Sequence, residues 1–444
     1  MFVSTIVVGC ITFTGPCKVH PVEYSRTVVF YLLAILLLCI CALRKELNMF
    51  ISLPMILFYV LYVCLIVKGQ LDCGAAELGE TDYLRLNKDE EGDLVELRDA
   101  SYRLIDVLGE TVEREIATIS SADEIADKGN YEHYMLKEIF EQPEALKATL
   151  QGRVSEKYVL PEAFGIKAPA IFSKTESVHI VACGTSYHAG LIAKYWLEEW
   201  AGVLCQVEVA SEYRYRACVV PKNTLFVTIS QSGETADTLA ALQTAKKSGY
   251  LASLVICNVA NSSLARASDL VLMTHAGPEI GVASTKAFTT QLAALQLLCI
   301  SLGRGRGLDR KKEQQLVEAL HQLPELCRKT LELSGAIEKI FQPFVDKKHA
   351  LFLGRGVQFP VALEGALKLK EISYVHAEAY PAGELKHGPL ALIDNKMPVI
   401  AVAPNNALLE KLKSNLQEVK ARGGQLFVFA DHDAGFENEP GVTV

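Results

Sequence analysis

The 444-residue sequence lacks the signatures of several common functional classes. None of its 12 cysteines forms a Cys-x-x-Cys pair or lies beside a histidine cluster, which argues against a zinc site and against a disulfide framework. Basic residues are not in excess, since 44 Lys and Arg stand against 52 Asp and Glu for a net charge of −8. Nucleic-acid binding is therefore not expected, because phosphate contacts need basic side chains. We expect no metal and a reducing, cytoplasmic compartment.

Two nucleotide-binding motifs are also missing. The sequence has neither the Gly-x-Gly-x-x-Gly dinucleotide fingerprint nor a P-loop with its lysine, so we expect no cofactor. What the sequence does have is a composition that supports a large core, with 50% hydrophobic and 22% charged residues. This excludes a disordered or fibrous protein, and the length suggests two or three domains.

The first 70 residues are unusually apolar. Two runs without a charge, 27–43 and 49–67, hold 17 and 19 residues. As helices they would be about 25 and 28 Å long, close to the roughly 30 Å of a bilayer core. Arg44 and Lys45 between them favour the cytoplasmic side. The pattern predicts a transmembrane hairpin through residues 27–67. The alternatives are a signal peptide, for which no cleavage site follows a single short run, and a mis-assembled gene start.

From residue 177 onward, apolar strands alternate with amphipathic helices. We expect strands at 177–182, 224–229, 251–257, 270–273, 349–353, 398–403 and 425–429. Such alternation predicts parallel sheets that are covered on both faces. The pattern recurs at an offset of 170 residues, which places Gly184 on Gly354. The predicted fold is α/β, with two doubly wound parallel-sheet domains in tandem.

The expected organisation has four parts. These are an apolar segment at 1–70, a short hairpin and linker at 71–130, a first α/β domain with bridging helices at 131–330, and a second α/β domain at 331–444. Asp309 is expected to cap one of the bridging helices.

Three polar loops of the first domain follow predicted strands or open a predicted helix, at 184–186, 230–235 and 281–286. Ligands of open parallel sheets bind beyond the carboxyl ends of the strands. The second loop leads directly into a helix start, where free N–H groups and the helix dipole favour an anion. Ser232 and Thr235 add hydroxyl donors there. The pattern predicts a cradle for a small phosphorylated molecule; the alternative is that these hydroxyls merely cap the helix.

Glu371 is the candidate general base. It is expected on one face of a helix at 360–375, together with the apolar residues Leu363, Leu367 and Val375. A carboxylate on such a stripe would be partly desolvated, which raises its pKa toward that of a useful base. The alternative is a structural ion-pair role on this helix, where Glu364 and Lys368 would form a solvated pair.

His387 lies in a loop bounded by glycine and proline, 382–389. Histidine suits proton transfer near neutral pH. The alternative is an ordinary surface histidine.

Three stretches carry a family resemblance. Residues 183–186 (CGTS), 230–238 (SQSGETADT) and 363–389 (LEGALKLKEISYVHAEAYPAGELKHGP) closely resemble the bacterial glutamine–fructose-6-phosphate aminotransferase (isomerizing) family, also called glucosamine-6-phosphate synthases. The resemblance covers about 131–435, the two sugar-isomerase (SIS) domains of that family. Residues 88–129 resemble the end of its glutaminase domain.

The resemblance implies formation of glucosamine 6-phosphate from fructose 6-phosphate and ammonia derived from glutamine. It implies a set of residues that hold the sugar phosphate: Thr185, Ser186, Ser230, Gln231, Ser232 and Thr235. Val282 and Ser284 would line the sugar. Glu371 would move the proton between C1 and C2, and Lys368 would steady the enolate-like charge. His387 would assist ring opening in the site of a neighbouring subunit, which implies a homodimer.

Two positions depart from the family pattern. The family has a nucleophilic Cys directly after the initiator Met, whereas Phe2 stands here, so we expect no glutamine hydrolysis. The family also continues beyond the position of Val444 with a tail whose lysine forms an imine with the sugar. Two function classes therefore stay open: an enzyme of hexose-phosphate amination and isomerisation, and a non-catalytic SIS-domain protein that binds or senses a sugar phosphate.

Overall fold

The computed structural model describes residues 128–436 continuously, together with the short segments 84–86, 94–98, 101–105, 110–113, 116–118 and 442–443. The predicted transmembrane hairpin at 27–67, and the whole apolar segment 1–70, lie outside these described residues. Among the helices that are described, none is long and apolar enough to span a bilayer.

Five short strands precede the α/β region: β1 (Leu84–Leu86), β2 (Leu94–Arg98), β3 (Ser101–Ile105), β4 (Thr111–Val112) and β5 (Ile116–Thr118). The hairpin expected in this region is formed by β2 and β3, which pair antiparallel, and β4 extends it. The helix α4 follows at Tyr134–Leu150.

The first α/β domain is built on a five-stranded parallel sheet in the order β10-β9-β8-β6-β7. Its strands are β6 (Ser177–Ala182), β7 (Leu204–Val209), β8 (Thr224–Ser230), β9 (Ala252–Cys257) and β10 (Leu270–Met273). Its further helices are α5 (Ala168–Lys174), α6 (Gly184–Trp200), α7 (Ala210–Tyr213), α8 (Ala236–Lys246), α9 (Ser263–Ala267) and α10 (Lys286–Gly303).

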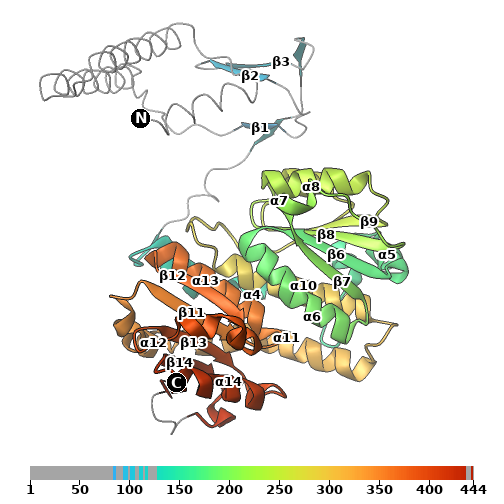
Figure 1. Cartoon of the computed structure of the whole chain (residues 1–444). Helices are drawn as coiled ribbons and strands as arrows, with labels where there is room; N and C mark the ends of the chain where they lie inside the picture. The colour runs from blue at the N-terminus through green and yellow to red at the C-terminus, as the bar shows by residue number, and fades with distance from the viewer. Residues whose placement is uncertain are drawn as a thin grey trace, which may run out of the picture. The chain divides into compact units, whose positions relative to one another are not determined.

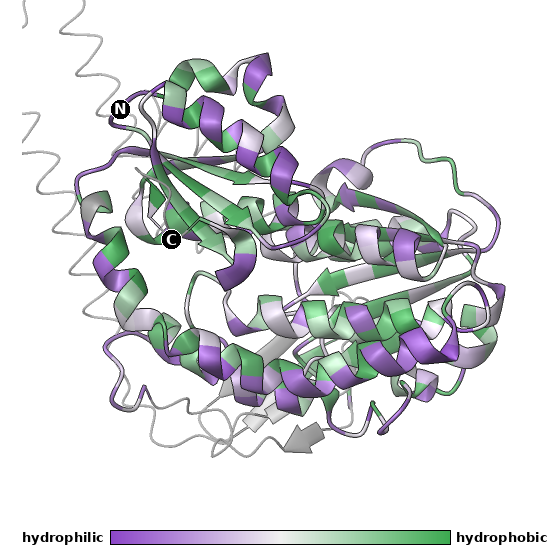
Figure 2. Ribbon diagram, turned by 90° about the horizontal axis from the view of Figure 1, so that it is seen from below, coloured by the Kyte–Doolittle hydropathy of each residue, from purple (hydrophilic) through white to green (hydrophobic). Residues whose placement is uncertain are grey.

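Alternate residues of the central strands enter two different cores, because side chains alternate across a strand. Ile180 packs in the cluster formed with α4, α6 and α10. Its neighbour Val181 packs in the cluster formed with α7, α8 and α9. Both side chains are fully buried, and burial of such a side chain contributes about 1.5–3 kcal/mol. The sheet is therefore covered on both faces, as the continuous apolar strands predicted. Figure 2 shows the strands as largely hydrophobic and the helices as mixed.

The second domain repeats this topology, with the strand order β12-β11-β13-β14-β15. Figure 1 labels β11, β12, β13 and β14 of this sheet. Its strands are β11 (His349–Gly354), β12 (His376–Pro381), β13 (Pro398–Ala403), β14 (Gln425–Ala430) and β15 (Val442–Thr443). Its helices are α13 (Gln358–Ser373) and α14 (Leu409–Ala421). In each sheet the first strand lies between the second and the third, so the predicted tandem of doubly wound domains is confirmed.

Two helices bridge the sheets, α11 (Arg310–Leu331) and α12 (Ser334–Phe341). Asp309 caps α11 as expected, because its Oδ1 accepts a hydrogen bond of 2.7 Å from the Lys312 N–H. Short 3₁₀ turns complete the described chain: η2 (Pro161–Phe164), η3 (Gln342–Phe344), η4 (Ala382–His387), η5 (Pro389–Leu392) and η6 (His432–Ala434).

At one edge of each sheet, the structure has a strand that the sequence did not predict. The strands β7 and β12 were not predicted. Each borders its sheet, is only partly buried, and mixes polar with apolar residues, so the continuous apolar run used to find the other strands is missing. The helix expected at 360–375 ends earlier, at Ser373, because Tyr374 adopts a left-handed conformation with φ 59°.

Candidate functional site

The site lies where the strand order of the first sheet reverses. The chain leaves β6 for β7 on one side and returns to β8 on the other. Crevices for ligands form at such switch points, outside the carboxyl ends of the strands. The strands β6 and β8 end at Ala182 and Ser230, and the helices α6 and α8 begin within a few residues of those ends. Two helix N-termini therefore lie at the ends of two adjacent strands.

The loop between β8 and α8 has the shape of a cradle. Ser230 Oγ accepts a hydrogen bond of 3.0 Å from the Gly233 N–H and lies 3.3 Å from Thr235 Oγ1. Ser232 Oγ accepts one of 3.2 Å from the Glu234 N–H. Gly233 adopts φ +69°, and a side chain there would collide with Ser262. Thr235 precedes α8 without a capping hydrogen bond from its own side chain, so its hydroxyl is not used as a simple helix cap.

These hydroxyls border one cavity of about 220 Å³. Its lining consists of Cys183, Thr185, Ser186, Ile229, Ser230, Gln231, Ser232, Thr235, Thr238 and Ser284. Of the eight residues that the sequence analysis named for sugar-phosphate binding, the structure brings seven together here. Val282 is not among the lining residues, and its side chain is fully exposed.

The sequence analysis named Glu364 of α13 only in its alternative, as one half of a solvated ion pair with Lys368. The pair is present at 3.4 Å, but it is not solvated, because Glu364 is only 5% exposed. Its Oε1 accepts a hydrogen bond of 2.9 Å from Thr185 Oγ1, and its Oε2 lies 2.7 Å from His188 Nδ1. Both partners belong to α6, so this carboxylate joins the second domain to the first. Sequence spacing within one helix could not show a contact across 179 positions.

Lys368 lies between the cavity and Glu371. Its Nζ donates a hydrogen bond of 3.2 Å to Thr185 Oγ1, which belongs to the cavity lining. The same Nζ lies 2.6 Å from Glu371 Oε2 and 3.4 Å from Glu364 Oε1. The ammonium is partly buried, with a side-chain exposure of 19%. One cation thus connects the cavity lining with both carboxylates of α13.

The prediction that Glu371 lies on an apolar stripe of the helix was wrong. Leu363 and Leu367 are only half-buried, Val375 lies beyond the end of the helix, and the Glu371 side chain is 32% exposed. The reason is that α13 packs against both β11 and β12 and against α6, so different residues are buried, among them Ala362 and Ala366. The environment of the Glu371 carboxylate is set by Lys368 rather than by an apolar face.

His387 is the last residue of η4 and has an exposed side chain. It is not among the residues that line the cavity. Within this single chain the structure therefore brings Lys368 to the predicted binding residues, and Glu371 to Lys368, but not His387.

One group in the described part of the chain has the composition of a metal site: His179, Glu208 and Cys218, whose ligand atoms lie within 4.8 Å of one another. The Arg216 guanidinium already pairs with the Glu208 carboxylate through two nitrogens, and one of these lies 3.6 Å from the Cys218 sulfur. Burial lowers the pKa of His179 below its ordinary value, although Glu208, 3.0 Å from its Nε2, opposes this. The hydrogen bond from Arg216 lowers the pKa of Glu208. The charges of this cluster are balanced without an ion.

The SIS domain family model matches residues 171–301 and 344–436. The chain is 63% identical over 356 residues to the glutamine–fructose-6-phosphate aminotransferase (isomerizing) of Pseudomonas syringae pv. tomato, and 59% identical to that of Vibrio vulnificus. The match with each covers 80% of this chain and 58% of the relative, so the chain spans less than two thirds of these relatives.

Among solved structures, it is similar to the C-terminal domain of glucosamine–fructose-6-phosphate aminotransferase from Francisella tularensis, with 53% identity and a TM-score of 0.70 over 72% of this chain and 90% of that one. A glucosamine-6-phosphate deaminase from Thermotoga maritima matches at 25% identity and a TM-score of 0.56, over 70% of this chain and 88% of that one. The chain belongs to the SIS-domain family and, within it, to the glutamine–fructose-6-phosphate aminotransferase (isomerizing) family.

Proposed function

We propose that the chain binds a hexose 6-phosphate in the cavity between α6 and α8 and isomerises it during the conversion of fructose 6-phosphate to glucosamine 6-phosphate. The observation that carries this is the cavity itself. Eight hydroxyl- or amide-bearing side chains surround about 220 Å³ at the switch point of a parallel sheet. Two helices begin at the same place, and their free N–H groups favour an anion.

The phosphate is held by the loop 230–235 without a dedicated basic side chain. Hydroxyls of Ser232 and Thr235 and the first N–H groups of α8 supply neutral donors. A hydrogen bond to a charged group contributes about 1.5–3 kcal/mol, so a few of them hold a phosphate dianion. Thr185 and Ser186 close the cavity from α6.

The isomerisation is assigned to Glu371 and Lys368. A shift between ketose and aldose moves a proton between C1 and C2, and one carboxylate that reaches both carbons can do this. The Lys368 ammonium lies 2.6 Å from Glu371 Oε2, so it holds in place the carboxylate that accepts the proton. Because the same ammonium contacts Thr185 at the cavity, it is placed to stabilise the negative charge that develops on the sugar oxygen.

Several wider features belong to the same proposal. His387 assists ring opening in the site of a second subunit of a homodimer. The SIS domains lie in the cytoplasm, which the six cysteines of the described region support because all are free.

Residues 27–67 anchor the chain to a membrane. Cross-linking and alkaline extraction of expressing cells test the dimer and the anchor, and a monomer or full extraction would contradict them.

Exchange with deuterated solvent tests the isomerisation. The chain is incubated with glucosamine 6-phosphate in deuterium oxide, and loss of the C2 proton is followed by NMR. Glu371→Gln should bind the ligand and slow this exchange about 100- to 10,000-fold, the range typical for removal of a general base. Glu410→Gln removes an exposed carboxylate of the same domain and should leave the rate unchanged. Binding without exchange by the unaltered chain would instead favour the sugar-phosphate sensor.

A further inference from the structure

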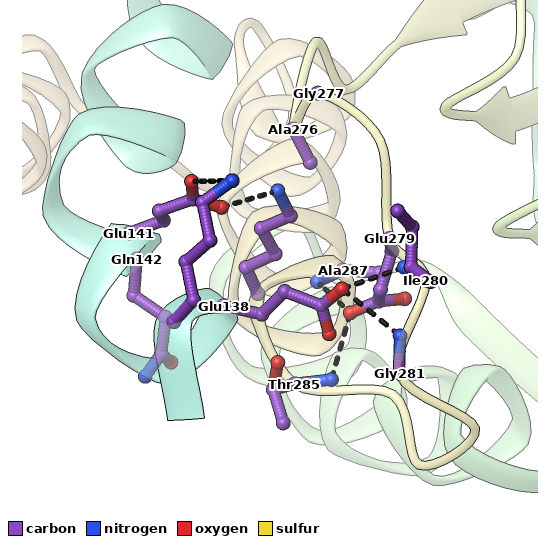
Figure 3. A network of polar contacts seen from close by, with 12 residues as sticks. Glu138, Glu141, Gln142, Ala276, Gly277, Glu279, Ile280, Gly281, Thr285 and Ala287 are labelled. Carbon is purple, nitrogen blue, oxygen red and sulfur yellow. Dashed lines mark hydrogen bonds and ion pairs between the residues drawn. The ribbon is translucent and has the colours of Figure 1, made fainter. Parts of the chain in front are cut away.

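The loop between β10 and α10 reaches the cavity through Ser284. This loop, residues 274–285, has no regular secondary structure, so something other than a sheet or helix must hold its shape. Thr149 of α4 binds its start, because its hydroxyl donates a hydrogen bond of 2.5 Å to the Thr274 carbonyl. Figure 3 shows that the Glu138 side chain of α4 is directed toward the rest of the loop.

Glu138 makes the central contact of this network (Figure 3). Its side chain rises from α4 and the residue is only 2% exposed. Its Oε1 accepts hydrogen bonds of 2.6 Å from the Ile280 N–H and 3.0 Å from the Gly281 N–H. Its Oε2 is buried and has no hydrogen-bond partner in the described part of the chain. One carboxylate oxygen therefore holds two successive backbone amides directly before Val282.

The remainder of the loop is held by Glu279 and by α4 again. Glu279 accepts hydrogen bonds of 2.8 Å from the Thr285 N–H and 3.0 Å from the Ser284 hydroxyl. Lys286, only 3% exposed, donates a hydrogen bond of 2.7 Å to Glu141. Glu141 lies three residues after Glu138, so both project from the same side of α4. The cavity residue Ser284 thus sits between two anchors on one helix.

We propose that Glu138 is a positioning residue for sugar recognition: it fixes the 280–281 backbone so that Ser284 faces the sugar while the phosphate is held elsewhere. This inference rests on the proposed function. The phosphate cradle at 230–235 belongs to a different loop with its own hydrogen bonds, so the two parts of a sugar phosphate depend on different anchors.

The chemistry of the anchor decides which substitutions are informative. A glutamine at 138 keeps an acceptor oxygen for both amides, and its NH₂ group replaces the oxygen that has no partner. A methionine has similar length and no acceptor, so it leaves two buried N–H groups without partners. Gly281 provides an independent perturbation, because a Cβ there would meet Glu138 Oε2 at 2.6 Å.

Calorimetric titration of the full chain with fructose 6-phosphate and with inorganic phosphate distinguishes binding of the sugar, which depends on Glu138, from binding of the phosphate, which depends on the 230–235 loop. Glu138→Met should weaken fructose 6-phosphate binding about tenfold, since unpaired buried amides let the loop move. Glu138→Gln should stay within about twofold of the unaltered chain for the same reason. Phosphate binding should stay constant in both. Glu144→Met, an exposed position on the same helix, is the matched control.

Unchanged fructose 6-phosphate binding by Glu138→Met overturns the proposal, and so does an equal loss for both ligands, which indicates a merely structural residue. If Glu138→Met does not fold, Gly281→Ala decides: it should reproduce the selective loss, whereas Gly335→Ala, which has open space around it, should not. A Gly281→Ala chain that binds both ligands normally refutes the assignment. No binding of fructose 6-phosphate by the unaltered chain would refute the proposed function instead.

Discussion

Replacement of Glu364 by glutamine should weaken the contact between the two α/β domains. The carboxylate is buried on α13 and contacts Thr185 at 2.9 Å, His188 at 2.7 Å and Lys368 at 3.4 Å. Glutamine keeps the shape and one acceptor but removes the charge. Lys368 retains Glu371 as a partner, so the change leaves no isolated cation.

The expected loss follows from the number of contacts. Hydrogen bonds to a charged group contribute about 1.5–3 kcal/mol and neutral ones about 0.5–1.5 kcal/mol. The two close contacts of Glu364 therefore lose about 1 kcal/mol each, or about 2 kcal/mol together. No discount for solvent screening applies, since the side chain is only 7% exposed.

Urea-induced unfolding followed by circular dichroism measures this loss. Glu410→Gln is the matched control, because its side chain is 82% exposed and a surface change stays within about 0.5 kcal/mol. A double-mutant cycle with His188→Asn should give a coupling energy of about 1 kcal/mol. If Glu364→Gln is as stable as the Glu410→Gln control, the contact does not hold the domains together and this reasoning fails.

Two further predictions concern stability. Burial holds the pKa of His179 below its unfolded value, and the hydrogen bond from Arg216 holds the pKa of Glu208 below its unfolded value. The unfolded chain therefore binds more protons than the folded chain. The free energy of unfolding should fall as the pH drops below about 6.5, the ordinary pKa of histidine. Thermal unfolding between pH 8 and 5 should show a weaker pH dependence in His179→Gln; an identical profile would show that His179 does not contribute. Gly233→Ala should destabilise the chain by more than about 1 kcal/mol, since its Cβ would lie 2.1 Å from Ser262 Oγ at a positive φ. Normal unfolding of that variant would contradict the cradle geometry.

Most of the fold could be predicted because its strongest signal is local. Strands such as β6 and β8 are buried along their whole length, so their sequences are continuous apolar runs between turn residues. The strands β7 and β12 were not predicted. Each lies at the edge of its sheet, and its sequence mixes polar with apolar residues. The strand β10 also lies at an edge, but it was predicted because its four residues are all apolar, so the mixed composition of β7 and β12 decides the difference.

The candidate site could be predicted where its residues follow strand ends. Ser230 and Thr185 come after adjacent strands, and the rule for parallel sheets brings them together. Glu364 and Glu138 could not be predicted in the same way. Each makes its contacts with a segment more than 140 residues away, and only tertiary packing turns these carboxylates from surface residues into buried anchors.

Titration with fructose 6-phosphate tests the central claim, that the cavity beside the 230–235 loop binds a hexose phosphate. We expect one binding site per chain in the unaltered protein. Binding should be lost in the double variant Ser232→Ala with Thr235→Ala, because both hydroxyls border the cavity while neither supports the core. Equal binding by the double variant and the unaltered chain would contradict the claim.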